Sequence, residues 1–208
     1  MKNVLLSAYA CDPTKGSENS YGYHWAVGIQ KAGNNVVCIT RHKGREGIEV
    51  QDVIKNVSFV YLDLPFGLEI LYKLSRPTMY LHYLLWQWFA YVKAKKLHKV
   101  KKFDIVHHVT WGSLQLGSFM YLLKAPFIFG PAGGGQVAPV KFKKYFKEYW
   151  AVEVKREFTS KLLMNINPGI TFMLKKAKHV LLVNSETVSL AINARARKFS
   201  LVTDCALD

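Results

Sequence analysis

Two glycine-containing turns, each after a strand-like segment, are the parts of this 208-residue chain best suited to hold an anion. In the first, loop 12–18, Gly16 would let a phosphate approach the backbone, and Ser17 and Glu18 lead into a helix whose first N–H groups favour negative charge. The loop matches neither the P-loop nor the Rossmann dinucleotide fingerprint. The alternative is an ordinary connector with Ser17 as the helix cap.

The second turn contains Gly133, Gly134, Gly135 and Gln136 and follows the apolar segment 126–129. Such a turn leaves several backbone N–H groups unpaired, with no side chains in the way. It can therefore cradle an anion or lie closely against a ligand. The alternative is a flexible loop.

His107 and His108 end another strand-like segment, and alternation places their side chains on opposite faces of a sheet. A histidine at the carboxyl end of a strand can act as a general base or bind a substrate hydroxyl. Two structural histidines are the alternative. No set of Cys, Asp or Glu residues accompanies them at ligand spacing, so no metal site is expected.

Aromatic and basic residues gather in two segments, 79–102 and 141–178. The apolar part of the first is too short to span a bilayer, which takes about 20 residues. Aromatic rings beside lysines are typical of a membrane interface, so together the segments predict a face that contacts anionic lipid. The alternative is a buried helix with a lysine-rich end in water.

The elements that position these residues alternate between strand and helix. Strands are expected over 4–8, 35–40, 57–62, 104–109, 126–129, 179–183 and 200–203, and helices over 21–32, 79–102, 113–123, 140–165, 169–178 and from Ser185, as N-cap, onward. This order predicts a Rossmann-like, doubly wound, mostly parallel α/β sheet with helices on both faces. The loops 9–19, 107–112, 130–139 and 184–186 would then gather at one rim, where such sheets bind ligands.

Charge and cysteine content narrow the partners and the compartment. The net charge of +15 favours an anionic partner. Three cysteines, Cys11, Cys38 and Cys205, without CxxC spacing are typical of a reducing compartment, and no signal peptide is evident. We therefore expect a cytoplasmic protein, peripheral on the inner membrane face if the basic surface binds lipid. No motif that reads nucleic acid is present, so nucleic acid is not expected as a partner.

Several motifs, spread over nearly the whole chain in the expected order, resemble the N-terminal half of a GT-B glycosyltransferase of family 4, in the bacterial branch that builds surface polysaccharides. They are segment 7–13 with Gly16, Ser17 and Glu18, then 104–108, then 126–139, then 183–186 with Ser185 and Glu186.

The resemblance implies specific roles. Gly16 would approach the donor's phosphate, Gly133 to Gly135 would line the cleft, and a histidine after the fourth strand would point at the transferred sugar. The family often has His-x-His with the second histidine in the catalytic role; that position is Val109 here, so His108 or His107 would serve. Relatives often have an acidic residue where this chain has Gln136. No cofactor is implied, because the nucleotide-sugar is itself the substrate and its diphosphate needs no metal.

The resemblance also implies that residues 1–208 form one N-terminal Rossmann-like domain, that a C-terminal donor-binding domain is missing, and that this chain alone is inactive. With that domain, a sugar would pass from a nucleotide-sugar to a lipid-linked or saccharide acceptor with retention. The main alternative is a non-catalytic basic module that docks on anionic membranes. A nucleotide-dependent oxidoreductase ranks lower, because the glycine fingerprint is absent.

Overall fold

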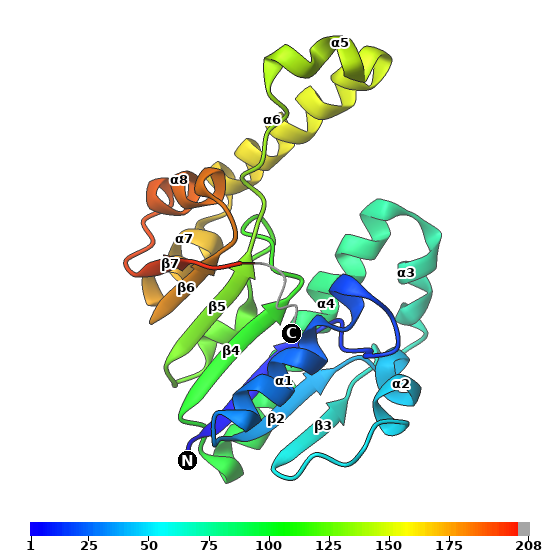
Figure 1. The fold of residues 1–208 in the computed structure, drawn as a ribbon, viewed down its shortest axis with the longest axis vertical. Coiled ribbons are helices and arrows are strands. Elements are labelled where there is room, and N and C mark those ends of the chain that lie inside the picture. The colour runs from blue at the N-terminus through cyan, green and yellow to red at the C-terminus, as the bar shows by residue number, and fades with distance from the viewer. Residues whose placement is uncertain (204–208) are drawn as a thin grey trace.

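The computed structural model describes residues 1–203, apart from the side chains of Ser17, Asn165 and Ile166. These residues form a seven-stranded, all-parallel sheet in the order β3-β2-β1-β4-β5-β6-β7 (Figure 1). The strands are β1 Asn3–Ala8, β2 Asn35–Thr40, β3 Val57–Tyr61, β4 Ile105–Thr110, β5 Phe127–Ala132, β6 His179–Leu182 and β7 Phe199–Leu201. The expected Rossmann-like α/β fold is confirmed, and the strand order reverses direction between β1 and β4.

Helices cover both faces of the sheet. They are α1 Tyr21–Lys31, α2 Arg45–Glu49, α3 Leu71–Leu74, α4 Arg76–Lys101, α5 Lys143–Phe146, α6 Trp150–Ile166, α7 Pro168–Lys176 and α8 Ser185–Asn193, with short 3-10 turns between some of them. In Figure 1, α1 lies in front of the sheet and α4 behind it.

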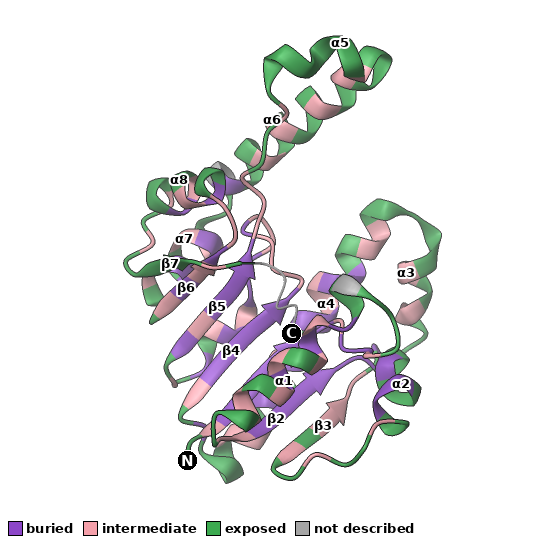
Figure 2. Cartoon of the chain, in the orientation of Figure 1, coloured by how far each residue is buried: buried purple, intermediate pink, exposed green. Residues whose placement is uncertain are grey.

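The alternating apolar residues of the strands divide the core between the two faces. Leu5, Val37 and Val106 pack in a cluster with Tyr83 and Trp86 of α4. Their chain neighbours enter a second cluster with Ala26 of α1 and Ile48 of α2; these strand residues are Leu6, Val36 and Cys38. Both faces of the inner strands are buried, which explains their nearly continuous apolar sequences (Figure 2).

Capping residues mark the start of α4 and the end of α1. The Ser75 hydroxyl accepts a hydrogen bond from the Thr78 N–H, and the Ser75 N–H donates to the Thr78 hydroxyl, so α4 starts at a complete capping box. Gly33 follows α1 with φ +81°, a conformation that suits glycine. Both helices lie within about three residues of the ends expected from the sequence.

Segment 113–123 is not the expected helix. The described chain there forms turns followed by a 3-10 helix, Phe119–Leu122. Gly117 has φ +58°, and Gln115 donates to the Gly134 carbonyl instead of facing a helical neighbour. Tertiary hydrogen bonds therefore override the apolar spacing that had suggested a helix.

Segment 140–165 is not one continuous helix either. Lys147 has φ +49°, which separates α5 from the 3-10 turn Lys147–Tyr149 and α6. We call residues 137–163 the arm. In Figure 1, α5 and much of α6 extend away from the sheet, and Figure 2 shows that the arm is largely exposed.

Candidate functional site

Four loops converge at the carboxyl edge of the sheet, as the alternation of strands and helices predicted. The Tyr9 N–H donates to the Thr110 carbonyl, which joins the loops after β1 and β4. The Gly133 N–H donates to the Gly112 carbonyl, and the Gly135 N–H donates to the Thr187 hydroxyl. The rim is thus one connected surface built from segments far apart in sequence.

The N–H groups of the glycine-rich turn at this rim form hydrogen bonds within the protein. The N–H groups of Gly133, Gly134 and Gly135 donate to the Gly112 carbonyl, the Gln136 side-chain oxygen and the Thr187 hydroxyl, over 2.8, 3.1 and 3.0 Å. Glycine is needed here for packing. Gly134 has φ +114°, and a Cβ on Gly135 would lie 2.4 Å from the Thr187 backbone nitrogen. In this conformation the turn closes the rim against α8 instead of offering an open anion cradle.

Loop 12–18 is more open. Asp12 accepts from the Thr14 N–H and pairs with Lys15 at 2.8 Å, which fixes the start of the loop. Burial acts to raise the pKa of Asp12, but the bonds from Lys15 and Thr14 outweigh it and lower that pKa. Gly16 is exposed, and a Cβ built there would meet no heavy atom within 4 Å. Space for a ligand therefore exists beside Gly16.

Residues 17–19 form a 3-10 turn, so the expected cap is displaced along the chain. Ser17 and Glu18 lie in this turn, and α1 begins after Ser20. The alternative in which Ser17 caps α1 is therefore wrong, because the turn delays the helix. Glu18 is exposed to solvent beside Gly16.

His107 is buried on the α1 side of the sheet. Its Nε2 lies 2.7 Å from the Gly130 carbonyl and therefore donates the hydrogen bond, and its ring meets Trp25 edge-to-face. Burial lowers the pKa of His107 to about 4, although the Gly130 carbonyl opposes this shift. His107 is thus neutral at pH 7 and ties β4 to the strand leading into the glycine turn.

His108 is buried on the opposite face, as alternation predicted. Its Nε2 lies 3.0 Å from the Tyr83 hydroxyl, which itself donates to the Trp111 carbonyl over 2.9 Å. His108 Nε2 must therefore carry the proton, and its buried Nδ1 has no partner among the described residues. Burial and neighbouring His107 lower the pKa of His108 to about 3. The ring stands one hydrogen-bonded residue away from the rim, and its catalytic role remains a prediction.

The start of α8 reaches the same rim. Asn184, not Ser185, is the N-cap, because its side chain accepts from the Thr187 N–H at 2.9 Å. The sequence offered two adjacent capping residues, and the first occupies the extended backbone position that a cap requires. Ser185 and Glu186 are exposed at the first turn of the helix, beside the turn that holds Gly135.

A pocket of about 200 Å³ opens between the loops after β1, β2 and β4, at the reversal of strand order. Ligands of doubly wound sheets bind at this crevice. We call it the rim pocket; its walls include Tyr9, Lys15, Arg41, Lys43, Tyr72 and Trp111. It therefore combines three aromatic rings with three cations.

A buried network holds Arg41 in this pocket. Its guanidinium lies between the rings of Tyr9 and Tyr72, 4.6 and 4.2 Å from their centroids. Glu69 lies 3.5 Å from Arg41 and 3.0 Å from His82, which in turn bonds the Tyr9 hydroxyl at 2.8 Å. Burial acts to raise the pKa of Glu69, but bonds from the Leu64 N–H and His82, with the charge of Arg41, lower it. The network thus favours the ionised form of Glu69.

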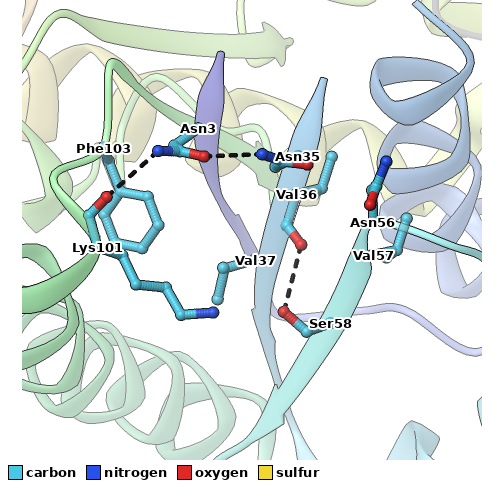
Figure 3. Close-up of a pocket in the computed structure, with 9 residues that line it drawn as sticks. All are labelled: Asn3, Asn35, Val36, Val37, Asn56, Val57, Ser58, Lys101 and Phe103. Atoms are coloured by element: carbon cyan, nitrogen blue, oxygen red, sulfur yellow. Dashed lines mark hydrogen bonds between the residues drawn. The ribbon is translucent and has the colours of Figure 1, made fainter. Parts of the chain in front are cut away.

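Another depression, of about 430 Å³, lies at the amino edge of the sheet (Figure 3). Its amides bond to one another and to the backbone: Asn35 donates to Asn3, and Asn3 donates to the Lys101 carbonyl. Of its lining residues only Lys101 is charged. Because the side chains of Asn3, Asn35 and Ser58 are already paired and the depression lies opposite the converging loops, we place the functional site at the rim pocket.

Most residues of the rim pocket were missed at the level of sequence. Tyr9, Arg41 and Trp111 each come directly after a strand. His107 and His108 were selected because they are polar side chains at the carboxyl end of a strand. The same criterion of position applies to Tyr9, Arg41 and Trp111. Tyr72 carries no such signal, because it reaches the pocket from α3, the short helix before α4.

Comparison with known proteins places the fold. No protein-family profile matches the sequence, and no curated protein shows significant sequence similarity. Among solved structures, sucrose-phosphate synthase from Thermosynechococcus elongatus superposes with a TM-score of 0.52 at 15% identity, over 98% of this chain and 48% of that chain. CalG4, the calicheamicin glycosyltransferase, superposes with a TM-score of 0.50 at 11% identity, over 97% and 52%. The chain thus has a fold found in glycosyltransferases and spans about half the length of these structures.

Proposed function

We propose that this chain is the acceptor-side domain of a retaining GT-B glycosyltransferase. It would transfer a sugar from a nucleotide-sugar to a hydroxyl of a saccharide or lipid-linked acceptor, with a second domain holding the nucleotide. The observation that supports this best is the rim pocket, which lies at the strand-order reversal of a fold shared with half of two glycosyltransferase structures. The resemblance of the motifs to family 4 points the same way.

In this proposal different residues of the rim bind the donor and the acceptor. Gly16 gives the donor's diphosphate close access to loop 12–18, where nothing within 4 Å would obstruct it. The aromatic rings of the rim pocket pack against the acceptor sugar. His108 is a positioning residue that holds Trp111 through the Tyr83 hydroxyl. Cations and backbone N–H groups stabilise the leaving diphosphate, so transfer needs no metal.

The test is a transfer assay on the complete natural protein with Gly16→Val. The substitution disturbs no packing, so the fold should be intact while the phosphate loses its closest approach. We expect transfer to fall at least about tenfold, the effect of about 1.4 kcal/mol. Gly28→Val is the matched control, since Gly28 is also unobstructed but lies in the last turns of α1, away from the rim. Undiminished transfer by the Gly16 variant would refute the proposed role.

A specific observation favours the second function, docking on anionic membrane. Among the described helices none is long and apolar enough to cross a membrane. Aromatic side chains of the arm are nonetheless open to solvent: Tyr145, Tyr149 and Phe158 are 68%, 66% and 65% exposed. By contrast Tyr83 and Trp86 of α4 are buried, so for that helix the alternative of a core helix with a solvated lysine end is the better description.

The charges of the arm fit the same docking function. Glu153 pairs with Arg156, and Glu157 pairs with Lys161. The lysines around α5 form no ion pair with any residue in the described part of the chain; they are Lys141, Lys143, Lys144 and Lys147. At about 1 kcal/mol for each lysine near an anionic surface, three of them contribute about 100-fold in affinity.

Liposome flotation tests this second function. The protein should float with vesicles of phosphatidylglycerol and phosphatidylcholine and stay behind with phosphatidylcholine alone. The triple variant K141Q/K143Q/K144Q should lose flotation, whereas K95Q/K96Q/K99Q, an equal charge change on exposed α4 lysines, should keep it. Equal recovery on both kinds of vesicle rejects the electrostatic contact.

A further inference from the structure

The rim pocket carries more positive charge than its own carboxylates balance. Asp12 pairs with Lys15, and Glu69 lies 3.5 Å from Arg41, at the outer limit of a hydrogen bond. Lys43 forms no ion pair with a described residue; its Nζ lies 4.6 Å from the centre of the Tyr72 ring. One cation of the pocket is therefore left for a ligand.

Arg41 also retains unused hydrogen-bonding capacity. It is only 7% exposed, yet its buried Nε has no hydrogen-bond partner among the described residues. A buried guanidinium N–H without a partner is costly, and a phosphate or carboxylate is the partner whose geometry fits the guanidinium best. Stacking between Tyr9 and Tyr72 fixes the guanidinium plane in advance, so little side-chain entropy is lost when an anion binds.

Size and aromatic walls define the rest of the ligand. The volume of about 200 Å³ suits one monosaccharide unit and is below the range of about 300–1,000 Å³ typical for drug-sized ligands. Trp111 is half-buried and meets Tyr9 edge-to-face at 4.9 Å, which leaves part of the indole open to the pocket. The apolar C–H face of a sugar ring can pack on such an aromatic surface.

We propose that the acceptor unit held in the rim pocket is an anionic monosaccharide, a sugar carrying a phosphate or a carboxylate. The anionic group binds Arg41 and Lys43, and the sugar ring packs against Trp111 and Tyr72. This inference rests on the proposed function, because it names the substrate class of that same site.

The test is calorimetric titration of the complete natural protein with four probes: glucose 6-phosphate, glucuronate, glucose and inorganic phosphate. We expect at least one anionic sugar to bind at least tenfold more tightly than glucose, and also more tightly than inorganic phosphate. Lys43→Gln should weaken that binding about tenfold or more, as expected for a charge-assisted hydrogen bond. Lys31→Gln, at the exposed far end of α1, should leave it unchanged.

Three results would overturn the inference. The first is glucose binding as tightly as both anionic sugars, and the second is inorganic phosphate binding as tightly as the better of them. The third is an affinity for the anionic sugar that is the same in Lys43→Gln and Lys31→Gln. The failure of the glycosyltransferase proposal looks different. Binding of an anionic sugar through Lys43 without any sugar transfer would support the anionic-sugar site and refute the glycosyltransferase proposal. Transfer to neutral acceptors without an effect of Lys43→Gln would support the glycosyltransferase and refute the anionic-sugar site.

Discussion

At the scale of single residues, the two strand-end histidines illustrate how burial changes the meaning of a residue type. Both lie where a parallel sheet presents ligand-binding groups. Both are nevertheless buried, and their Nε2–H groups donate hydrogen bonds within the protein. His108 reaches the rim only through the Tyr83 hydroxyl and the Trp111 carbonyl. The exposed chemistry at this rim belongs instead to Lys15, Lys43 and Trp111.

Tyr83→Phe tests the bridge from His108 to Trp111. Removal of the hydroxyl leaves the buried His108 Nε2–H without a partner, whereas the Trp111 carbonyl still accepts from the Ser113 N–H. The free energy of unfolding should therefore fall by about 1–3 kcal/mol. Tyr145→Phe is the control, because Tyr145 is exposed and its change should stay within about 0.5 kcal/mol. Urea unfolding measures both. Equal effects of the two substitutions would show that the bridge contributes nothing.

At the scale of elements, the sequence predicted every strand of the sheet and the helices α1 and α4 closely. Continuous apolar runs mark strands buried on both faces, and Ser75, Gly33 and similar residues mark helix ends. The prediction of a helix over 113–123 failed because Gln115 bonds to Gly134, which is distant in sequence, and because Gly117 adopts a positive φ. No local pattern reveals either feature. The same limit applies to the site: loops 12–18 and 130–139 were found, but Tyr72 joins Arg41 only after folding.

The continuity of the helix expected over 140–165 was mispredicted in a different way. Apolar residues recur there every four positions and form the stripe of the arm: Phe142, Phe146, Trp150, Val154, Phe158 and Leu162. Such amphipathic spacing does not say what covers the stripe. In the structure water covers much of it, and the backbone breaks at Lys147. The stripe is therefore largely outside the core, and its contact with anionic lipid stays a prediction.

Matched phenylalanine substitutions test this reading of the arm. Phe158→Ala should change the free energy of unfolding by no more than about 0.5 kcal/mol, because Phe158 is largely exposed. Phe129→Ala, at a fully buried position of β5, should cost about 3–5 kcal/mol. Thermal or urea unfolding in the absence of lipid supplies the numbers. A Phe158 cost that approaches the Phe129 cost would mean that the arm packs into the fold in water.

At the scale of the whole molecule, the buried histidines predict that stability depends on pH. The folded pKa values of His107 and His108 are about 4 and about 3, whereas an unfolded histidine titrates near 6.5. Below about pH 6.5 these histidines bind protons in the unfolded chain but stay neutral in the folded chain. The free energy of unfolding therefore falls as the pH falls toward 4. The expected slope is about 1.4 kcal/mol per pH unit for each histidine.

Urea unfolding between pH 7 and pH 5 measures this slope. His107→Gln removes one titrating group while its amide can still donate to the Gly130 carbonyl, so the slope should decrease by about the share of one histidine. Stability that stays constant over this range, or a slope that His107→Gln leaves unchanged, would contradict the neutral buried state of these rings.

The whole fold also explains why one edge of the sheet should carry the function. All strands run in parallel, so the loops after β1, β2, β4 and β5 open at the same edge of the sheet. The strand order reverses between β1 and β4, and the loops after these two strands therefore diverge and leave room for the rim pocket. At the amino edge, the side chain of Asn35 donates to Asn3, and that of Asn3 donates to the Lys101 carbonyl (Figure 3). We therefore expect the ligand to enter between the loops after β1, β2 and β4.

A crystal structure of the complete natural protein soaked with glucose 6-phosphate tests that expectation most directly. We predict that the sugar lies in the rim pocket, with its phosphate within hydrogen-bonding distance of Arg41 or Lys43 and its ring beside Trp111. Density for the sugar in the amino-edge depression around Asn3 and Asn35, with the rim pocket empty, would contradict it.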